Sequence, residues 1–125
     1  MPASPTSVTL RPLPSGPCEQ RLGIYLDGAY AGGITVHSID RAQGVFSYGI
    51  AIARAMRRRG VAHEAITQLL SRYAAQGFSR CAVEVYADNE ASLLLHAKLG
   101  FAQTSRFLKD GRETVRLERE MAKTD

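Results

Sequence analysis

Arg57-Arg58-Arg59-Gly60-Val61-Ala62 is the stretch that decides the fold, because it joins an alternating apolar segment to a segment with helical periodicity. Apolar residues recur at positions 65, 66, 69, 70, 73 and 74, which predicts an amphipathic helix that ends near Gly77. Gly60 permits a ligand to approach the backbone closely, and the first helical turn has N–H groups without partners inside the helix. A strand that runs straight into a helix through such a junction is suited to bind phosphate.

A second motif follows at Asp88-Asn89-Glu90-Ala91-Ser92-Leu93-Leu94-Leu95-His96-Ala97-Lys98-Leu99-Gly100-Phe101. Together the two motifs resemble those of the GNAT acetyltransferase superfamily. Its members share a Q/R-x-x-G-x-G/A loop that binds acyl-CoA and a helix of the pattern N-x-x-A/S-x-x-L-Y/H-x-K-x-G-F. The match extends from about residue 46 to the C-terminus. Residues 47–52 and 64–66, on either side of the loop, are most similar to the branch that includes ribosomal-protein N-terminal acetyltransferases.

The resemblance implies that acetyl-CoA (coenzyme A) is the acyl donor and that three segments bind it. These segments contribute Ile50 and Ile52 from a strand, Arg57, Arg58, Arg59, Gly60, Val61, Ala62 and His63 from the loop and helix start, and Asn89, Ser92, Leu95, His96 and Lys98 from the second motif. Asn89 is also suited to cap the helix that begins at Glu90, with Asp88 as a competing cap.

Acyl transfer from a thioester needs a neutral amine, a donor for the oxyanion and a proton for the leaving thiolate. A backbone N–H near Ile52 meets the second need without a particular side chain. By resemblance, His96 stands where relatives use a tyrosine as general acid. An imidazole with a pKa of about 6.5 is able to protonate a thiolate whose conjugate acid is near 8.5. The alternative is a surface histidine that favours the helix C-terminus.

The general base is less clearly marked, because residues 45–53 contain no carboxylate. Glu84 on the following strand and Tyr48 are the nearest candidates, and a chain of water molecules serves equally well. Glu84 is otherwise a strand carboxylate that faces solvent or pairs with a cation. No H-x-x-x-H or C-x-x-C pattern occurs in the sequence, so no metal site is expected.

Composition agrees with one small globular domain. The chain has 125 residues, of which 45% are hydrophobic and 22% charged, a balance typical of a folded protein. The net charge is +4, and Arg54 with residues 57–59 forms a basic cluster that suits a polyanion. Coenzyme A is favoured over nucleic acid, because the cluster coincides with the phosphate loop and has no aromatic residues between its arginines.

The sequence has no long apolar run and no basic segment followed by an apolar one at its N-terminus. We therefore expect neither a membrane span nor a cleaved signal peptide. Cys18 and Cys81 are far apart in the sequence and are expected to remain thiols rather than form a disulfide. The expected compartment is the cytoplasm.

Residues 1–7 are predicted to be a flexible tail and residues 8–125 a single N-acetyltransferase domain. Alternation and turn signals predict strands at residues 8–11, 22–26, 30–37, 45–53, 80–87, 101–108 and 114–117. Prolines 12, 14 and 17 argue against regular structure after residue 11. The fold class is α+β, a mixed and mostly antiparallel sheet flanked by helices. The resemblance implies the acyl-CoA N-acyltransferase fold, with a splay between strands 45–53 and 80–87.

One departure from the family concerns the acceptor side. Relatives carry one or two helices between their first two strands, but here about ten residues separate Arg11 from Leu22. The acceptor side is therefore either open or completed by a second subunit, and we expect a homodimer. Residues 25–37 and the strand around residues 114–118 are the candidate covering elements.

Two functions remain open. The first is an N-acetyltransferase that moves an acetyl group from acetyl-CoA to a primary amine of a small molecule or protein. The second is a non-catalytic acyl-CoA-binding or regulatory module, suggested by the missing helices and the absent strand glutamate.

Overall fold

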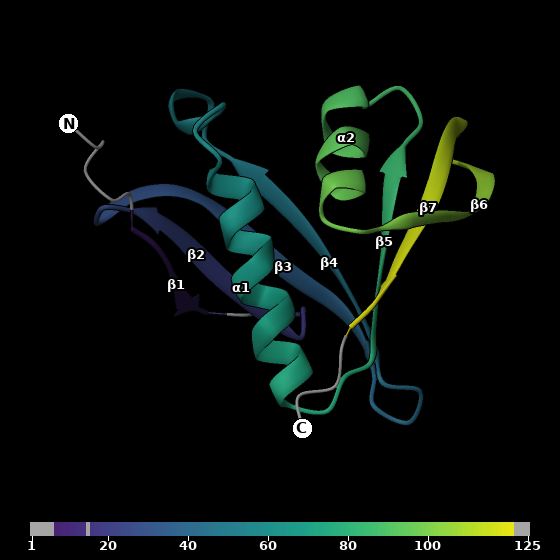
Figure 1. Ribbon diagram of the computed structural model, residues 1–125, viewed down its shortest axis with the longest axis horizontal. Helices are drawn as coiled ribbons and strands as arrows, with labels where there is room; N and C mark the ends of the chain where they lie inside the picture. The colour runs from purple at the N-terminus through teal and green to yellow at the C-terminus, as the bar shows by residue number, and fades with distance from the viewer. Residues whose placement is uncertain (1–6, 15, 122–125) are drawn as a thin grey trace.

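In residues 7–14 and 16–121, which the computed structural model describes, a seven-stranded sheet carries two α-helices on one face (Figure 1). The strands are β1 Val8–Leu13, β2 Gln20–Leu26, β3 Ala29–Asp40, β4 Val45–Ile52, β5 Arg80–Tyr86, β6 Ala102–Lys109 and β7 Arg112–Glu120. The helices are α1 Val61–Ala75 and α2 Glu90–Lys98, and a short 3-10 helix, η1, spans Arg54–Met56. No helix in the described part of the chain is long and apolar enough to cross a membrane.

The order of strands across the sheet is β1-β2-β3-β4-β5-β7-β6. Neighbouring strands are antiparallel except for β4 and β5, which are parallel. The predicted fold class, a mixed and mostly antiparallel sheet with helices packed on it, is therefore confirmed. Most of the predicted tail, residues 1–6, lies outside the described residues. Its last residue, Ser7, pairs with the turn after β2, because the Ser7 N–H donates to Asp27 Oδ1 at 2.8 Å.

The first strand extends further than its prolines predict. β1 continues through Pro12 and Leu13, which pair with Leu22 and Arg21 of β2. The expectation of irregular structure after residue 11 was wrong, because β1 is an edge strand and a proline there need not donate to a ladder. The described residues between β1 and β2, 14 and 16–19, form no helix, as their number predicted.

The core lies between the sheet and α1. Five of the six residues of the predicted apolar stripe are buried, namely Ala65, Ile66, Leu69, Leu70 and Tyr73, whereas the sixth, Ala74, is half-buried. The helix also buries Val61, which the stripe did not include. On β4, Phe46 stacks on Tyr73 with ring centroids 4.1 Å apart and meets Phe78 edge-on at 5.8 Å. Burying a side chain of this size contributes roughly 1.5–3 kcal/mol to folding. This aromatic cluster holds α1 against the sheet where β4 begins.

The predicted splay lies immediately beyond this cluster. β4 and β5 pair at Val45 with Arg80 and at Phe46 with Cys81, and they then diverge (Figure 1). Residues 47–52 of β4 have ladder partners on β3 only, whereas β5 pairs with β7 on its other side. The backbone groups along the open side of β4 are thus available to an extended ligand.

The open edges of the sheet are β1 and β6. β7 contains residues 114–118 and lies between β5 and β6, so this candidate covering element has no unpaired edge. β6 has no buried residue, and Leu108 near its end is 72% exposed. The face of the sheet opposite α1 and α2 carries no helix among the described residues (Figure 1).

Candidate functional site

Gly60 is the N-cap of α1 and has a left-handed backbone with a φ of 74°. The Glu64 N–H donates to the Gly60 carbonyl at 3.2 Å, which closes the first turn of the helix. No side chain among the described residues caps the three preceding N–H groups, and a Cβ on Gly60 would meet no atom within 4 Å. The helix therefore presents bare N–H groups to open space, an arrangement that fits a phosphate group.

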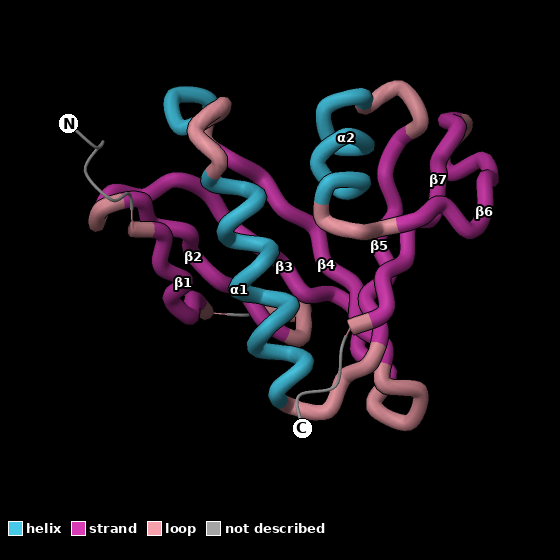
Figure 2. The backbone as a smooth tube through the Cα atoms, in the orientation of Figure 1, coloured by secondary structure: helices cyan, strands magenta, loops and turns pink. Residues whose placement is uncertain are grey.

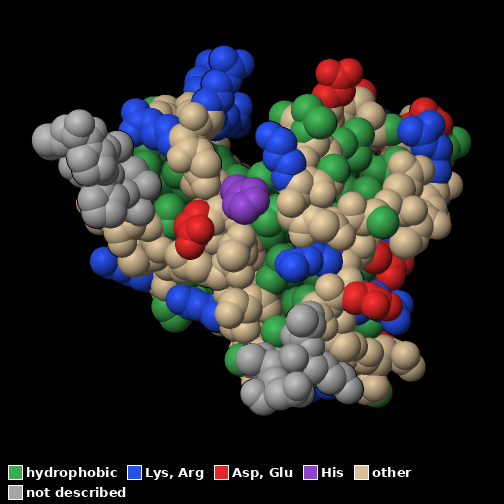
Figure 3. All heavy atoms as spheres, in the orientation of Figure 1, with side chains coloured by type: hydrophobic (Ala, Val, Ile, Leu, Met, Phe, Trp, Pro, Cys, Tyr) green, Lys and Arg blue, Asp and Glu red, His purple; other side chains and the backbone are tan. Residues whose placement is uncertain are grey.

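The arginines before Gly60 are exposed and lie on a loop, because η1 and five further residues separate β4 from α1 (Figure 2). The expectation that the strand runs straight into the helix was wrong in this respect. Arg57 Nε donates to the Ile52 carbonyl at 3.2 Å and so ties the loop to the end of β4. Figure 3 shows Lys and Arg side chains gathered over this loop, across a hollow from the apolar side chains of α2.

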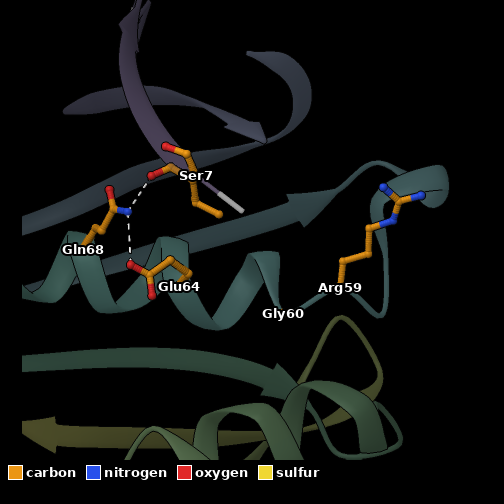
Figure 4. Close-up of a pocket in the computed structure, with 6 residues that line it drawn as sticks. Ser7, Arg59, Gly60, Glu64 and Gln68 are labelled. Atoms are coloured by element: carbon orange, nitrogen blue, oxygen red, sulfur yellow. Dashed lines mark hydrogen bonds between the residues drawn. The ribbon is translucent and has the colours of Figure 1, made fainter. Parts of the chain in front are cut away.

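A hollow of about 420 Å³ adjoins the loop on the side of β1, and Arg59 and Gly60 line it (Figure 4). Its floor is held by Gln68, whose Nε2 donates to the Val8 carbonyl at 2.7 Å and to Glu64 Oε1 at 3.3 Å. Nothing in the sequence indicated that Gln68 belongs to this site, because its partner Val8 is 60 residues away.

α2 begins as predicted. Asn89 Oδ1 accepts from the Ser92 N–H at 3.1 Å and caps the helix, whereas Asp88 pairs with Arg112 at 3.2 Å. Leu95 is half-buried and Lys98 is exposed. The N-terminal halves of α1 and α2 stand on either side of the splay (Figure 1). The two sequence motifs therefore lie on the two sides of the splay.

Tyr48 of β4 and His96 of α2 meet inside the splay. Tyr48 Oη lies 2.9 Å from His96 Nε2, and the two side chains are 4% and 2% exposed. The interpretation of His96 as a surface histidine is wrong, because the residue is buried and also packs edge-on against Phe101 at 5.0 Å. This pair joins the two residues that the sequence marked separately as candidate base and candidate acid.

The bonding of His96 fixes the position of its proton. His96 Nδ1 lies 2.8 Å from the Ser92 carbonyl, which only accepts, so Nδ1 carries the hydrogen. Burial lowers the pKa of His96, and the imidazole is therefore neutral at pH 7. Nε2 then has a free lone pair, and the Tyr48 hydroxyl donates to it. Burial also raises the pKa of Tyr48, so this hydroxyl keeps its proton.

We expect His96 to make the fold sensitive to acid. Because the pKa of His96 is lowered in the folded state, the unfolded chain binds a proton here at pH values where the folded chain does not. The free energy of unfolding should therefore fall as the pH drops below about 6.5, the pKa in the unfolded chain. Urea denaturation across this range measures the effect, and His96→Gln should flatten the pH dependence. Equal slopes for the two proteins would show that His96 titrates normally.

A second hollow, of about 490 Å³, opens on the helix-free face beside the splay. Glu84 and Tyr86 line it from β5. Tyr48 of β4 also lines it, because beyond Phe46 β4 has no paired strand on the side of β5. Lys109 Nζ lies 2.7 Å from Glu84 Oε1, and this hydrogen bond raises the pKa of Lys109. Glu84 is thus both exposed and paired with a cation, as one of its two interpretations predicted. His37 lines the same hollow.

Known proteins resemble this chain in sequence and in fold. Residues 5–101 match the model of the Acetyltransferase (GNAT) family. The SPbeta prophage-derived uncharacterized N-acetyltransferase YokL of Bacillus subtilis (strain 168) is 29% identical over 89 residues, which are 70% of this chain and 50% of YokL. The chain thus spans about half the length of this relative.

Two solved structures share the fold. Mutant forms of the spermidine/spermine N-acetyltransferase SpeG from Vibrio cholerae align with a TM-score of 0.80 and 15% identity over 91% of this chain and 95% of theirs. RimL, a ribosomal L7/L12 alpha-N-protein acetyltransferase in complex with coenzyme A, aligns with a TM-score of 0.76 and 16% identity over 82% of this chain and 62% of its own. With its two motifs on the two sides of the splay and a family model that matches most of its length, this chain belongs to the acetyltransferase (GNAT) family.

Proposed function

We propose that the protein transfers an acetyl group from acetyl-CoA to a primary amine. The observation that carries the proposal is the splay, which has the bare N-terminus of α1 at one end and the buried Tyr48–His96 pair inside it. Acetyl-CoA supplies an activated acetyl carbon when it is bound. The chain supplies a phosphate site, an open strand edge and a pair of groups that exchange a proton.

The donor lies along the helix-bearing face in this proposal. Its phosphates meet the N–H groups of residues 61–63, and the three arginines before Gly60 supply positive charge. Its pantetheine arm lies along the open side of β4, beside Ile50 and Ile52, and faces α2. On α2 the contacts come from residues of the second motif, Asn89, Ser92, Leu95 and Lys98, whereas His96 of the same motif is buried behind them and contributes little to the affinity.

The acceptor enters the hollow on the helix-free face. Among the described residues that line it, Glu84 is the one carboxylate, and Lys109 already pairs with it. A polyamine carries several ammonium groups and needs several carboxylates, so we expect poor turnover of spermidine. A single amine next to a neutral or anionic group, such as the α-amine of a peptide, fits this hollow better. No helix of the described part of the chain covers this face, so the size of the acceptor depends on whether a second copy covers it.

Release of free thiol from acetyl-CoA, measured with a panel of amines, tests the function. We expect turnover with at least one α-amine substrate and little with spermidine. Binding of acetyl-CoA without turnover of any amine would favour the alternative, a non-catalytic acyl-CoA-binding module. The observation that favours this alternative is the Glu84–Lys109 pair, because it occupies the one carboxylate among the described residues that line the hollow.

We also propose that two copies associate over the helix-free face. Tyr30, at the start of β3, is 57% exposed, and the edges of the sheet are unpaired. A two-fold dimer covers such a surface with one self-complementary patch. Sedimentation at micromolar concentration is expected to give the mass of two chains. A monomer with full activity would show instead that the enzyme works with an open acceptor side.

A further inference from the structure

The direction of the hydrogen bonds around His96 decides what the buried pair is able to do. The His96 Nδ1 hydrogen is committed to the Ser92 carbonyl at 2.8 Å, and Ser92 Oγ lies 3.3 Å from the same nitrogen. Nε2 therefore accepts from Tyr48 at 2.9 Å. In this state His96 has no proton to give to a leaving thiolate, but its free lone pair is able to receive one through Tyr48.

Tyr48 also reaches the side from which the acceptor comes. It belongs to the core on the helix-bearing face, and it lines the hollow on the opposite face. It thus connects the acceptor hollow to His96, which lies deeper in the molecule. Three of the groups beside this pair are poor proton acceptors at neutral pH, and a fourth, His37, is a second imidazole that lines the acceptor hollow. Burial raises the pKa of the Cys81 thiol, Arg119 is a cation, and the Glu84 carboxylate is paired with Lys109.

We propose that Tyr48 and His96 form a proton relay that deprotonates the acceptor amine. Tyr48 is the group that touches the amine, and His96 acts through it. The relay rests on the proposed acetyl transfer, and it assigns His96 the receiving role rather than the acid role that the family motif implies.

The protons and charges balance in this step. The acceptor ammonium gives one proton to Tyr48 Oη while the hydroxyl's own proton passes to His96 Nε2, which leaves a neutral amine and an imidazolium. The neutral amine then forms the C–N bond to the acetyl carbon, and the C–S bond breaks with its electron pair on sulfur. The second proton of the nitrogen ends on that sulfur as a thiol. The imidazolium returns its proton to water through Tyr48, so one proton is released overall.

The relay also predicts which amines react. Because burial lowers the pKa of His96, the imidazole is a weak base. It takes a proton more readily from an α-amine of pKa about 7.7–8.0 than from a lysine-like amine of pKa about 10.4, and the difference is a factor of roughly 300. The shortage of carboxylates in the hollow also favours an α-amine over a polyamine. The two arguments are independent, because one rests on the pKa of His96 and the other on the lining of the hollow.

Two variants test the relay in the whole protein. Tyr48→Phe removes the hydroxyl and keeps the ring, and His96→Gln keeps an acceptor for Tyr48 that cannot hold a proton. Each should lower kcat on the order of a hundredfold or more and leave the affinity for coenzyme A nearly unchanged. The wild-type kcat should fall along an acid limb below pH 6.5, and this limb should disappear in His96→Gln. Tyr73→Phe is the matched control, because Tyr73 is also 4% exposed and its hydroxyl donates to Gln20 Oε1 at 2.7 Å.

A measurement without substrate gives an independent readout. Long-range ¹H–¹⁵N correlation spectra of the free protein should find the His96 hydrogen on Nδ1 near neutral pH, with Nε2 bare. A hydrogen on Nε2 would overturn the relay. If the wild type is active and His96→Gln has the same kcat and the same acid limb, the relay is overturned but the proposed function is not. Coenzyme A binding without wild-type turnover of any amine would overturn the proposed function and the relay with it.

Discussion

Gly60→Val is expected to abolish binding of coenzyme A while the domain stays folded. Gly60 has a φ of 74°, and a Cβ there would meet no atom within 4 Å, so the valine side chain would fill the space in front of the bare N–H groups of α1. A phosphate could then no longer reach those groups. We expect the affinity, measured by calorimetry, to fall on the order of a hundredfold or more. The left-handed backbone itself costs about 1–2 kcal/mol of stability.

Gly111→Val provides a matched control for this strain. Gly111 lies in the turn between β6 and β7 and has a φ of 76°, and a Cβ on it would likewise meet no atom within 4 Å. The two variants should lose similar stability, but Gly111→Val should bind coenzyme A as the wild type does. Wild-type affinity in Gly60→Val would show that the phosphates bind elsewhere.

Phe46→Ala is expected to give the largest loss of stability, about 3–5 kcal/mol. Phe46 is 1% exposed and contacts Tyr73 and Phe78, so its removal leaves a cavity that a rigid cluster cannot close. Phe46 also forms, with Cys81, one of the two ladder pairs that join β4 to β5. Urea denaturation monitored by circular dichroism measures the change.

Leu108→Ala is the matched control, because Leu108 is 72% exposed and its truncation should change the stability by no more than about 0.5 kcal/mol. A similar small change in Phe46→Ala would mean that the aromatic cluster does not hold the helix to the sheet.

The parts of the fold that follow from local pattern could be predicted from the sequence. The helix stripe and the cap at Asn89 depend on residues close in sequence. The splay between β4 and β5 was implied by the family resemblance, and the structure places its start after Phe46. The length of β1 was underestimated. Proline disrupts a strand inside a sheet because it has no N–H to donate, but this does not apply at the edge of the sheet, where Pro12 lies.

The inner contacts of the candidate site could not be predicted in the same way. Tyr48 and His96 are 48 residues apart, and Lys109 and Glu84 are 25 apart. Such contacts depend on strand register and on how α2 sits against the sheet, and periodicity fixes neither. For this reason the sequence marked Tyr48 and His96 as candidates without indicating that they are bonded to each other, or in which direction.

The two ladder pairs between β4 and β5 also have a consequence for how the domain opens. Strands β1–β4 with α1, and β5–β7 with α2, are each hydrogen-bonded within themselves but share few backbone bonds across the splay. Amide exchange should therefore occur in two cooperative units, with one unit able to open while the other stays closed. A ligand that spans the splay links them, so its binding should slow exchange in both units together. Cofactor binding then acts as part of the folding energy of this small domain.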